Sequence, residues 1–221
     1  NVLGYTSNIG GGGKNTVFLG TGKNTTTYST IGGGSGNITY GSSNFIGGGT
    51  TNYTNGSASS ILGGVSNSAT TDFTTIAGGS LNLTNGVHSS ILGGFCNIVS
   101  GDTSSIGGGC CNIVGGNKSF IGGGSGNTVS ECFSFIGGGR NNNISAYQAT
   151  IVGGRNNTAS QTNTVIGGGL CNTASAAWSG ILGGRYNNTS TFNDSMIIGT
   201  SITANRDCTT FVNDMTIVSM A

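Results

Sequence analysis

The segment SFIGGGSGNTVS at Ser119–Ser130 contains the pattern that decides the fold of this chain. Ile121 is followed by glycines at offsets two and three, and Asn127 stands at offset six. The same four residues return at the same offsets in eleven consecutive 15-residue units, the first beginning at Ile31 and the last at Ile181. A strict period indicates a repeat architecture, and fifteen residues are too few for a helix-turn-helix unit. We therefore predict an all-β chain folded as a parallel β-solenoid, with one coil per unit.

The positions of each unit, numbered from isoleucine as position 1, fit two short strands. Positions 14, 1 and 3 lie two residues apart, so we expect them to share the inward face of one strand. A second strand would hold asparagine at position 7 and a small or β-branched residue at position 9. The Gly-Gly pair at positions 3 and 4 is expected to bend the chain between these strands, and position 11 to make the return bend.

The repeated asparagines form a column that we interpret as structural. Stacked side-chain amides can donate and accept hydrogen bonds along the solenoid axis, and asparagine tolerates left-handed backbone beside a bend. The predicted ladder consists of Asn37, Asn52, Asn67, Asn82, Asn97, Asn112, Asn127, Asn142, Asn157, Asn172 and Asn187.

The composition excludes several classes of partner. Glycine contributes 45 residues, proline none, and charged residues only 6%, with a net charge of +1. Disordered chains usually combine high net charge with no hydrophobic periodicity, which is the opposite pattern. There is no basic patch of the kind that neutralises nucleic-acid phosphates, and no apolar run approaches the roughly 20 residues of a membrane-spanning helix. We expect neither nucleic-acid binding nor membrane insertion.

The chain is poor in the residues that catalysis and metal binding require. His88 is the only histidine, and no Asp column of the calcium-binding repeat type exists. Asp72 and Asp102 share position 12 two coils apart, about 9.6 Å by strand spacing, at the edge of the separation for inverting glycosidases. Solvated turn residues are the favoured interpretation, and a glycan-hydrolysing pair is the alternative. We predict no enzyme, no catalytic residue, no metal and no cofactor.

Six cysteines are present, and three of them share position 6: Cys96, Cys111 and Cys171. The simplest interpretation is that this position tolerates small residues. Cys96 and Cys111 would lie one coil apart, about 4.8 Å between Cα atoms, so a disulfide is the alternative.

Exposed arginine and aromatic residues late in the repeats are the candidate binding residues. Position 5 carries a short basic stripe, and positions 12 and 13 carry aromatic rings. Such side chains stack on sugar rings and bind hydroxyls or carboxylates. The candidate glycan- or surface-binding residues are Trp178, Tyr147, Arg155, Arg185 and Tyr186. The alternative is that the rings pack in a groove between chains.

The outward positions of the first strand are also partly apolar. Positions 15 and 2 hold Phe45, Phe120, Phe135 and Val165, with Leu62, Leu92, Val152 and Leu182. A strand that is apolar on both faces is usually buried on both faces. One face would fill the coil, so the other predicts an obligate homo-oligomer whose axis is parallel to the rod.

The unit Ser119–Ser130 resembles the head repeats of YadA-like trimeric adhesins, and similar glycine-rich repeats occur in tail fibres of bacteriophages and other viruses. The resemblance covers residues 2–205 and implies a left-handed parallel β-roll in a homotrimeric rod. The Gly-Gly-x-x-Asn segment departs from the adhesin pattern. Thr209–Ile217 resembles the segment that precedes a C-terminal tip or chaperone domain in phage fibres.

These observations predict three regions and a function. Residues 1–30 would form shortened N-terminal coils, 31–195 the eleven repeats, and 196–221 a closing segment. The expected function is the shaft of a phage or viral tail fibre that mediates host attachment, located in the virion. The alternatives are a bacterial trimeric autotransporter adhesin head at the cell surface, and a polysaccharide depolymerase tailspike. The expected partners are two sister chains, a host cell-surface glycan or receptor, and other fibre or tail proteins.

Overall fold

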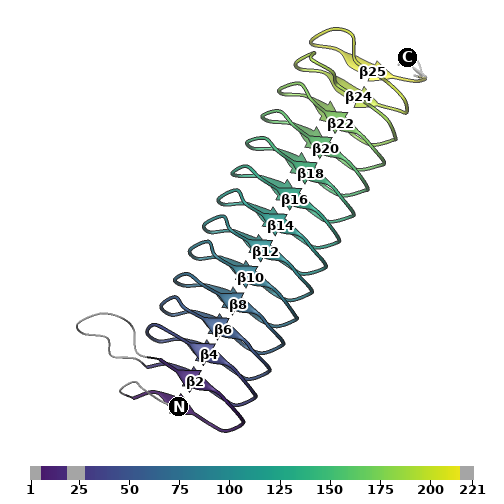
Figure 1. Cartoon of the computed structure of the whole chain (residues 1–221). Helices are drawn as coiled ribbons and strands as arrows, with labels where there is room; N and C mark the ends of the chain where they lie inside the picture. The colour runs from purple at the N-terminus through teal and green to yellow at the C-terminus, as the bar shows by residue number, and fades with distance from the viewer. Residues whose placement is uncertain (1–5, 19–27, 215–221) are drawn as a thin grey trace, which may run out of the picture.

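The chain forms a straight rod of stacked parallel β-strands (Figure 1). The computed structural model describes residues 6–18 and 28–214. Within these ranges every regular element is a β-strand, and successive strands of a sheet are parallel. Ile106 pairs with Ile121, fifteen residues later, so each sequence unit makes one coil. The prediction of an all-β parallel solenoid with 15-residue coils is confirmed.

The larger sheet has fourteen strands, and most of them end on the repeated isoleucine. Its strands are β1 (Asn8–Ile9), β3 (Thr30–Ile31), β5 (Phe45–Ile46), β7 (Ser60–Ile61), β9 (Thr75–Ile76), β11 (Ser90–Ile91), β13 (Ser105–Ile106), β15 (Phe120–Ile121), β17 (Phe135–Ile136), β19 (Thr150–Ile151), β21 (Val165–Ile166), β23 (Gly180–Ile181), β24 (Met196–Ile198) and β25 (Thr210–Val212).

The smaller sheet has eleven strands, ten of which occupy positions 8 and 9 of the units that begin at Ile31 to Ile166. Its strands are β2 (Thr16–Val17), β4 (Ile38–Thr39), β6 (Tyr53–Thr54), β8 (Ser68–Ala69), β10 (Leu83–Thr84), β12 (Ile98–Val99), β14 (Ile113–Val114), β16 (Thr128–Val129), β18 (Asn143–Ile144), β20 (Thr158–Ala159) and β22 (Thr173–Ala174).

A third ladder runs between the two sheets at position 5. It consists of single-residue parallel bridges, from Gly13↔Ser35 to Leu170↔Arg185. The sequence did not predict it, because these bridges are formed by backbone groups and the side chains at position 5 vary. Each coil is therefore held to the next at three places.

The core is one residue layer thick at each coil. Ile121 and Val129 are fully buried, as are their equivalents at positions 1 and 9 along the rod. Position 14 also points inward, as expected, but the expectation for position 3 is wrong. The strand ends at position 1, and a Cβ atom at Gly63 or Gly78 would meet nothing within 4 Å. Position 3 therefore lies in the bend and not on the inward face of a strand.

Glycine at position 4 is required by both conformation and space. Gly79 has φ of +87°, and a Cβ atom there would collide with the carbonyl oxygen of Gly94 in the next coil. Only glycine adopts this backbone conformation at such close approach without strain. The bend predicted at the Gly-Gly pair is therefore made by its second glycine.

The side chains of the repeated asparagines are buried and bind backbone groups of their own coil and of the next. Asn127 accepts the backbone N–H of Asn142 on Oδ1 at 3.0 Å. Its Nδ2 donates to the carbonyl oxygens of Gly123 and Gly139, both at 3.0 Å. Asn127 Nδ2 also donates to the side-chain oxygen Oδ1 of Asn112 in the preceding coil, at 3.1 Å, so the column of asparagines is continuous here. The ladder thus joins amides to the backbone as well as to each other.

The coils at both ends depart from fifteen residues. Ile9 pairs with Ile31, so this coil spans 31 − 9 = 22 residues, where we expected shortened coils. Ile181 pairs with Ile197, and Ile197 with Phe211, which gives coils of 16 and 14 residues. Two of the shortened coils were expected at residues 2–8 and 18–24, where the motif is echoed in the sequence, and residues 2–5 and 19–24 of these lie outside the described ranges.

Candidate functional site

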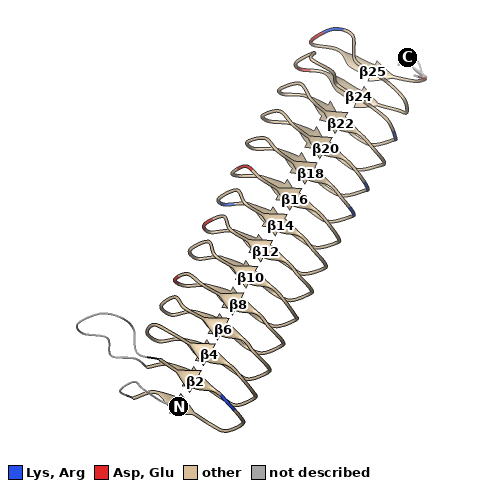
Figure 2. Cartoon of the chain, viewed as in Figure 1, with Lys and Arg blue, Asp and Glu red and all other residues tan. Residues whose placement is uncertain are grey.

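The bends of the solenoid form two edges on opposite sides of the rod. We call positions 3–6 the glycine edge and positions 11–13 the return edge. Along the eleven repeats, Figure 2 shows basic residues alone on one edge, whereas the other edge carries acidic residues together with Lys118. On the glycine edge the basic residues are Lys14, Arg140, Arg155 and Arg185. Within the eleven repeats the glycine edge therefore carries no acidic residue, whereas Lys118 adds a basic residue to the return edge.

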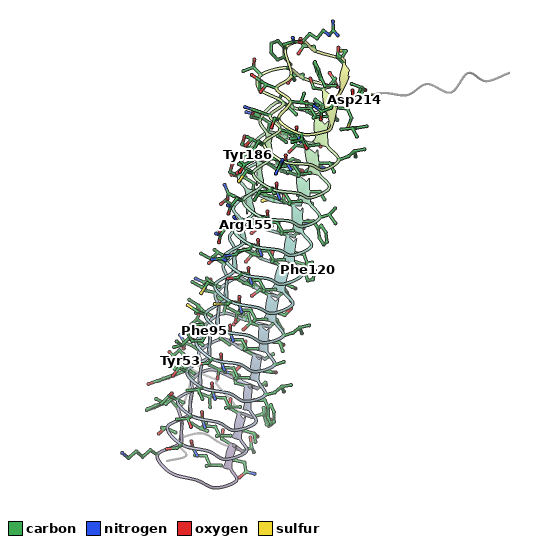
Figure 3. The ribbon with its side chains drawn as sticks, turned by 90° about the vertical axis from the view of Figure 1, so that its right-hand side faces the viewer. Tyr53, Phe95, Phe120, Arg155, Tyr186 and Asp214 are labelled. Atoms are coloured by element: carbon green, nitrogen blue, oxygen red, sulfur yellow. The ribbon has the colours of Figure 1, made fainter. Side chains whose placement is uncertain are left out.

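The five residues predicted to bind a glycan do not form one site. Arg155, Arg185 and Tyr186 lie on the glycine edge, where Figure 3 labels Arg155 and Tyr186 along the same side. Tyr147 and Trp178 lie on the return edge. Positions 5 and 12 are seven residues apart in a 15-residue coil, which is about half a turn. The sequence spacing alone therefore indicated that the two groups lie on opposite sides of the rod.

The arginines of the glycine edge are aligned by backbone pairing. Arg140 and Arg155 are bridge partners on consecutive coils, and Arg155 is joined through Leu170 to Arg185. All three arginines are exposed. Their side chains therefore leave the rod from equivalent backbone positions and along one line.

Position 6 adds residues in left-handed backbone beside the arginines. Asn141, Asn156 and Tyr186 have φ of 53°, 55° and 57°. Asparagine is favoured in this region, whereas a bulky residue such as tyrosine is not. Tyr186 nevertheless occupies it with 57% of its surface exposed. Its ring is thus held in solvent at a conformational cost.

The outward face of the smaller sheet changes character halfway along the rod. At position 8 the N-terminal coils carry mainly apolar residues, whereas the C-terminal coils carry hydroxyls and amides. The apolar members are Ile38, Tyr53, Leu83, Ile98 and Ile113, with Ser68 as the exception, and the polar members are Thr128, Asn143, Thr158, Thr173 and Asn188. Our sequence reasoning missed this change because it considered only the inward residues of the second strand.

The return edge carries aromatic rings that contact one another. Phe73 stacks on His88 with centroids 4.7 Å apart. Lys118 Nζ lies 5.1 Å from the centroid of the Phe133 ring, which contacts Tyr147 edge-on at 5.4 Å. Position 13 of every unit from 31 to 180 has positive φ, so the rings of Phe73, His88 and Phe133 stand in left-handed backbone, whereas Tyr147 is at position 12. Trp178, with 66% of its surface exposed, is the most accessible of these side chains.

The carboxylates of Asp72 and Asp102 bind the backbone of the preceding coil. Asp72 Oδ1 accepts the N–H of Ser57 at 2.7 Å, and Asp102 Oδ1 accepts the N–H of Val87 at 2.8 Å. Asn117 makes the same contact with the N–H of Asp102 at 2.8 Å. An acidic or amide side chain at position 12 therefore ties neighbouring return bends together, in agreement with the turn interpretation.

All six cysteines carry free thiols. Cys110 Sγ lies 3.0 Å from Cys111 Sγ. Hydrogen bonding with the Cys110 thiol is the main reason that the pKa of the exposed Cys111 is raised to about 11, and desolvation and Cys96 add to the shift. The alternative of a Cys96–Cys111 disulfide is therefore not formed in this structure.

Residues 6–18 and 28–214 lack two other kinds of site. No group of three or more His, Cys, Asp or Glu side chains in this part of the chain is placed to hold a metal ion. These ranges also contain no helix with the length and apolar character needed to cross a membrane.

The fold and its edges define the chain as a β-solenoid rod. Neither a model of a known protein family nor a curated protein matches its sequence. Its function is therefore argued from its surfaces.

Proposed function

We propose that this chain is the shaft of a homotrimeric viral or phage tail fibre that attaches to a host surface. The observation that carries the proposal is an apolar column along the outward face of the larger sheet. The column follows a rod in which each repeat has the same backbone pairing, with the apolar residue at position 15 or position 2 of the unit. The resemblance of the repeat to trimeric adhesins and tail fibres supports the same interpretation.

The apolar column is exposed along the length of the single chain. Its members are Phe45, Leu62, Leu92, Phe120, Phe135, Val152, Val165, Leu182, Met196 and Ile198. Leu92 has 64% of its surface exposed, and Phe120 and Phe135 stack on consecutive coils with centroids 5.9 Å apart. Burial of apolar surface stabilises by about 25 cal/mol per Å², and extended apolar patches mark interaction surfaces.

Sister chains are the occupants that fit this column best. A copy in the same register would present the same side chains at every coil, so one favourable contact is repeated along the rod. A heterologous contact that closes by rotation gives a ring, and three copies would close around an axis parallel to the rods. The two edges would then face outward and display the variable residues.

The oligomer is tested by light scattering at low concentration. One chain has a mass of 21.8 kDa, and we expect a species of about three times that mass. Phe120→Asp combined with Phe135→Asp should give a monomer with an unchanged β-sheet circular dichroism spectrum. Gln161→Asp, on the return edge, is the matched control and should remain trimeric. A wild-type chain that stays monomeric would overturn the proposal.

Attachment is tested separately from assembly. The labelled trimer is incubated with purified bacterial surface polysaccharides, and both bound protein and new reducing ends are measured. Binding without release of reducing ends supports an attachment fibre. Release above background would replace this function with that of a depolymerase.

A further inference from the structure

The arginines of the glycine edge have no acidic neighbour at positions 1–10 of the eleven repeats. Arg140 and Arg155 are bridge partners, so two like charges leave backbones about 4.8 Å apart. Like charges on paired strands are destabilising. An external anion would relieve this repulsion and satisfy the donors of both guanidinium groups.

The surface next to these arginines is polar along the same coils. The outward residues of β16, β18, β20 and β22 are Thr128, Asn143, Thr158 and Thr173, all half-buried. Hydroxyl and amide groups both donate and accept hydrogen bonds, which matches the hydroxyls of a sugar. This polar face begins one coil before the first arginine, so the two features coincide along the rod.

We propose that the arginine edge (Arg140, Asn141, Arg155, Asn156, Arg185 and Tyr186), with the adjoining polar face, binds an acidic polysaccharide that lies along the rod. This inference deepens the proposed attachment function and rests on it. Guanidinium groups bind carboxylate or sulfate with two parallel hydrogen bonds, which gives orientation as well as affinity. The exposed ring of Tyr186 adds an amphipathic surface for a sugar ring.

A polysaccharide fits this surface better than a nucleic acid does. Three arginines spread over four coils neutralise few phosphates, so the release of counterions would contribute little. Binding of single strands also requires a series of aromatic platforms, and Tyr186 is the one aromatic residue at positions 5 and 6 between residues 121 and 195.

The arginine edge stays accessible in the proposed trimer. In Figure 3, Arg155 and Tyr186 lie on one side of the rod, and Phe120 of the apolar column lies on the other. Sister chains that cover the apolar column would therefore leave the arginines free for a ligand.

The test compares two triple variants with the same loss of charge. Arg140→Gln, Arg155→Gln and Arg185→Gln remove the proposed site. Lys14→Gln, Lys118→Gln and Arg206→Gln remove three exposed cations elsewhere, Lys14 being on the same edge at the other end. The full chain and both variants are titrated against immobilised polygalacturonate, neutral dextran and duplex DNA by biolayer interferometry.

We expect the wild-type chain to bind polygalacturonate and not dextran, with affinity that falls as salt rises. The affinity of the arginine variant for polygalacturonate should fall roughly tenfold or more, and that of the control variant about twofold or less. Equal losses in both variants, equal binding of dextran, or equally tight binding of duplex DNA would overturn the inference.

Failure of the inference can be separated from failure of the proposed function. Light scattering and binding to whole bacterial surfaces are measured on the same samples. A trimer that attaches equally well with and without the arginines overturns the acidic-polysaccharide site alone. A wild-type chain that neither trimerises nor attaches overturns the attachment function itself.

Discussion

Asn127 joins its coil to the next, because its Oδ1 accepts the backbone N–H of Asn142 at 3.0 Å. The same relationship links the repeated asparagines down the rod, and it ends where Asn187 accepts the N–H of Ile202 at 3.0 Å. Each amide also donates to glycine carbonyls at the neighbouring bends. The asparagine side chains therefore supply hydrogen-bond partners to buried backbone groups at the bends, which do not pair within the sheets.

Replacement of a ladder asparagine should destabilise the rod strongly. Asn127→Ala leaves the N–H of Asn142 and the carbonyls of Gly123 and Gly139 without this partner. Each buried group left unpaired costs about 1–3 kcal/mol. We expect a clear fall in the urea midpoint. The exposed Asn85→Ala is the control, and equal midpoints for the two variants would contradict a structural ladder.

A charge at position 1 should have a different effect from a charge at position 15. Ile121 is fully buried, so Ile121→Asp places an unpaired carboxylate in a core one residue thick and should unfold the chain. Phe120, its neighbour, has 39% of its surface exposed, so Phe120→Asp should leave the single chain folded. Thermal unfolding followed by circular dichroism distinguishes them. An unchanged melting temperature for Ile121→Asp would refute the inward assignment.

The repeat predicted the fold because its invariant residues perform local tasks. Isoleucine fills the coil, the second glycine turns it, and Asn127 and its equivalents bind the bends. The third ladder at position 5 was not predictable in this way, because Ser125 and Arg140 pair there through backbone groups alone. The 22-residue coil after Ile9 was also missed, since the motif fixes the start of a coil and not the length of its return loop.

The two glycines of each bend should differ sharply in their tolerance of alanine. Gly79 has φ of +87°, and a Cβ atom there would collide with Gly94 of the next coil. A Cβ atom at Gly78 meets nothing within 4 Å. Gly79→Ala should therefore lower the melting temperature far more than Gly78→Ala. Similar losses in the two variants would show that general glycine content, and not close approach, controls the bend.

The candidate site was predicted less well than the fold because it depends on the direction of side chains. The sequence identified Arg155 and Trp178 as exposed, and both are exposed. It placed them on one surface, although the coil puts them on opposite edges. The change from Ile113 to Thr128 at position 8 was visible in the sequence. Its relevance to binding depends on the fold, which places the outward face of the second strand next to the arginine edge.

Removal of a buried hydroxyl should stabilise the rod. Thr84 Oγ1 is buried at position 9 and has no hydrogen-bond partner, in a column where other coils carry valine or alanine. Thr84→Val keeps the shape of the side chain and removes an unsatisfied polar group, a gain of about 1 kcal/mol. We expect a higher urea midpoint. Thr75→Val, at a partly exposed position, serves as the control and should change the midpoint less.

The reactivity of Cys111 should depend on its neighbour Cys110. The hydrogen bond with the Cys110 thiol is the main cause that raises the pKa of Cys111 to about 11 from its usual 9.0. The thiolate is the nucleophile, so alkylation of Cys111 under reducing conditions should rise with a midpoint near pH 11.

Because the folded pKa is raised, the folded chain retains this proton between about pH 9 and 11, and the contribution of Cys111 to stability is lost as pH rises through that window. In Cys110→Ala the midpoint for Cys111, followed by peptide mass spectrometry, should move towards 9.0. The same midpoint in both proteins would show that Cys110 does not control this thiol.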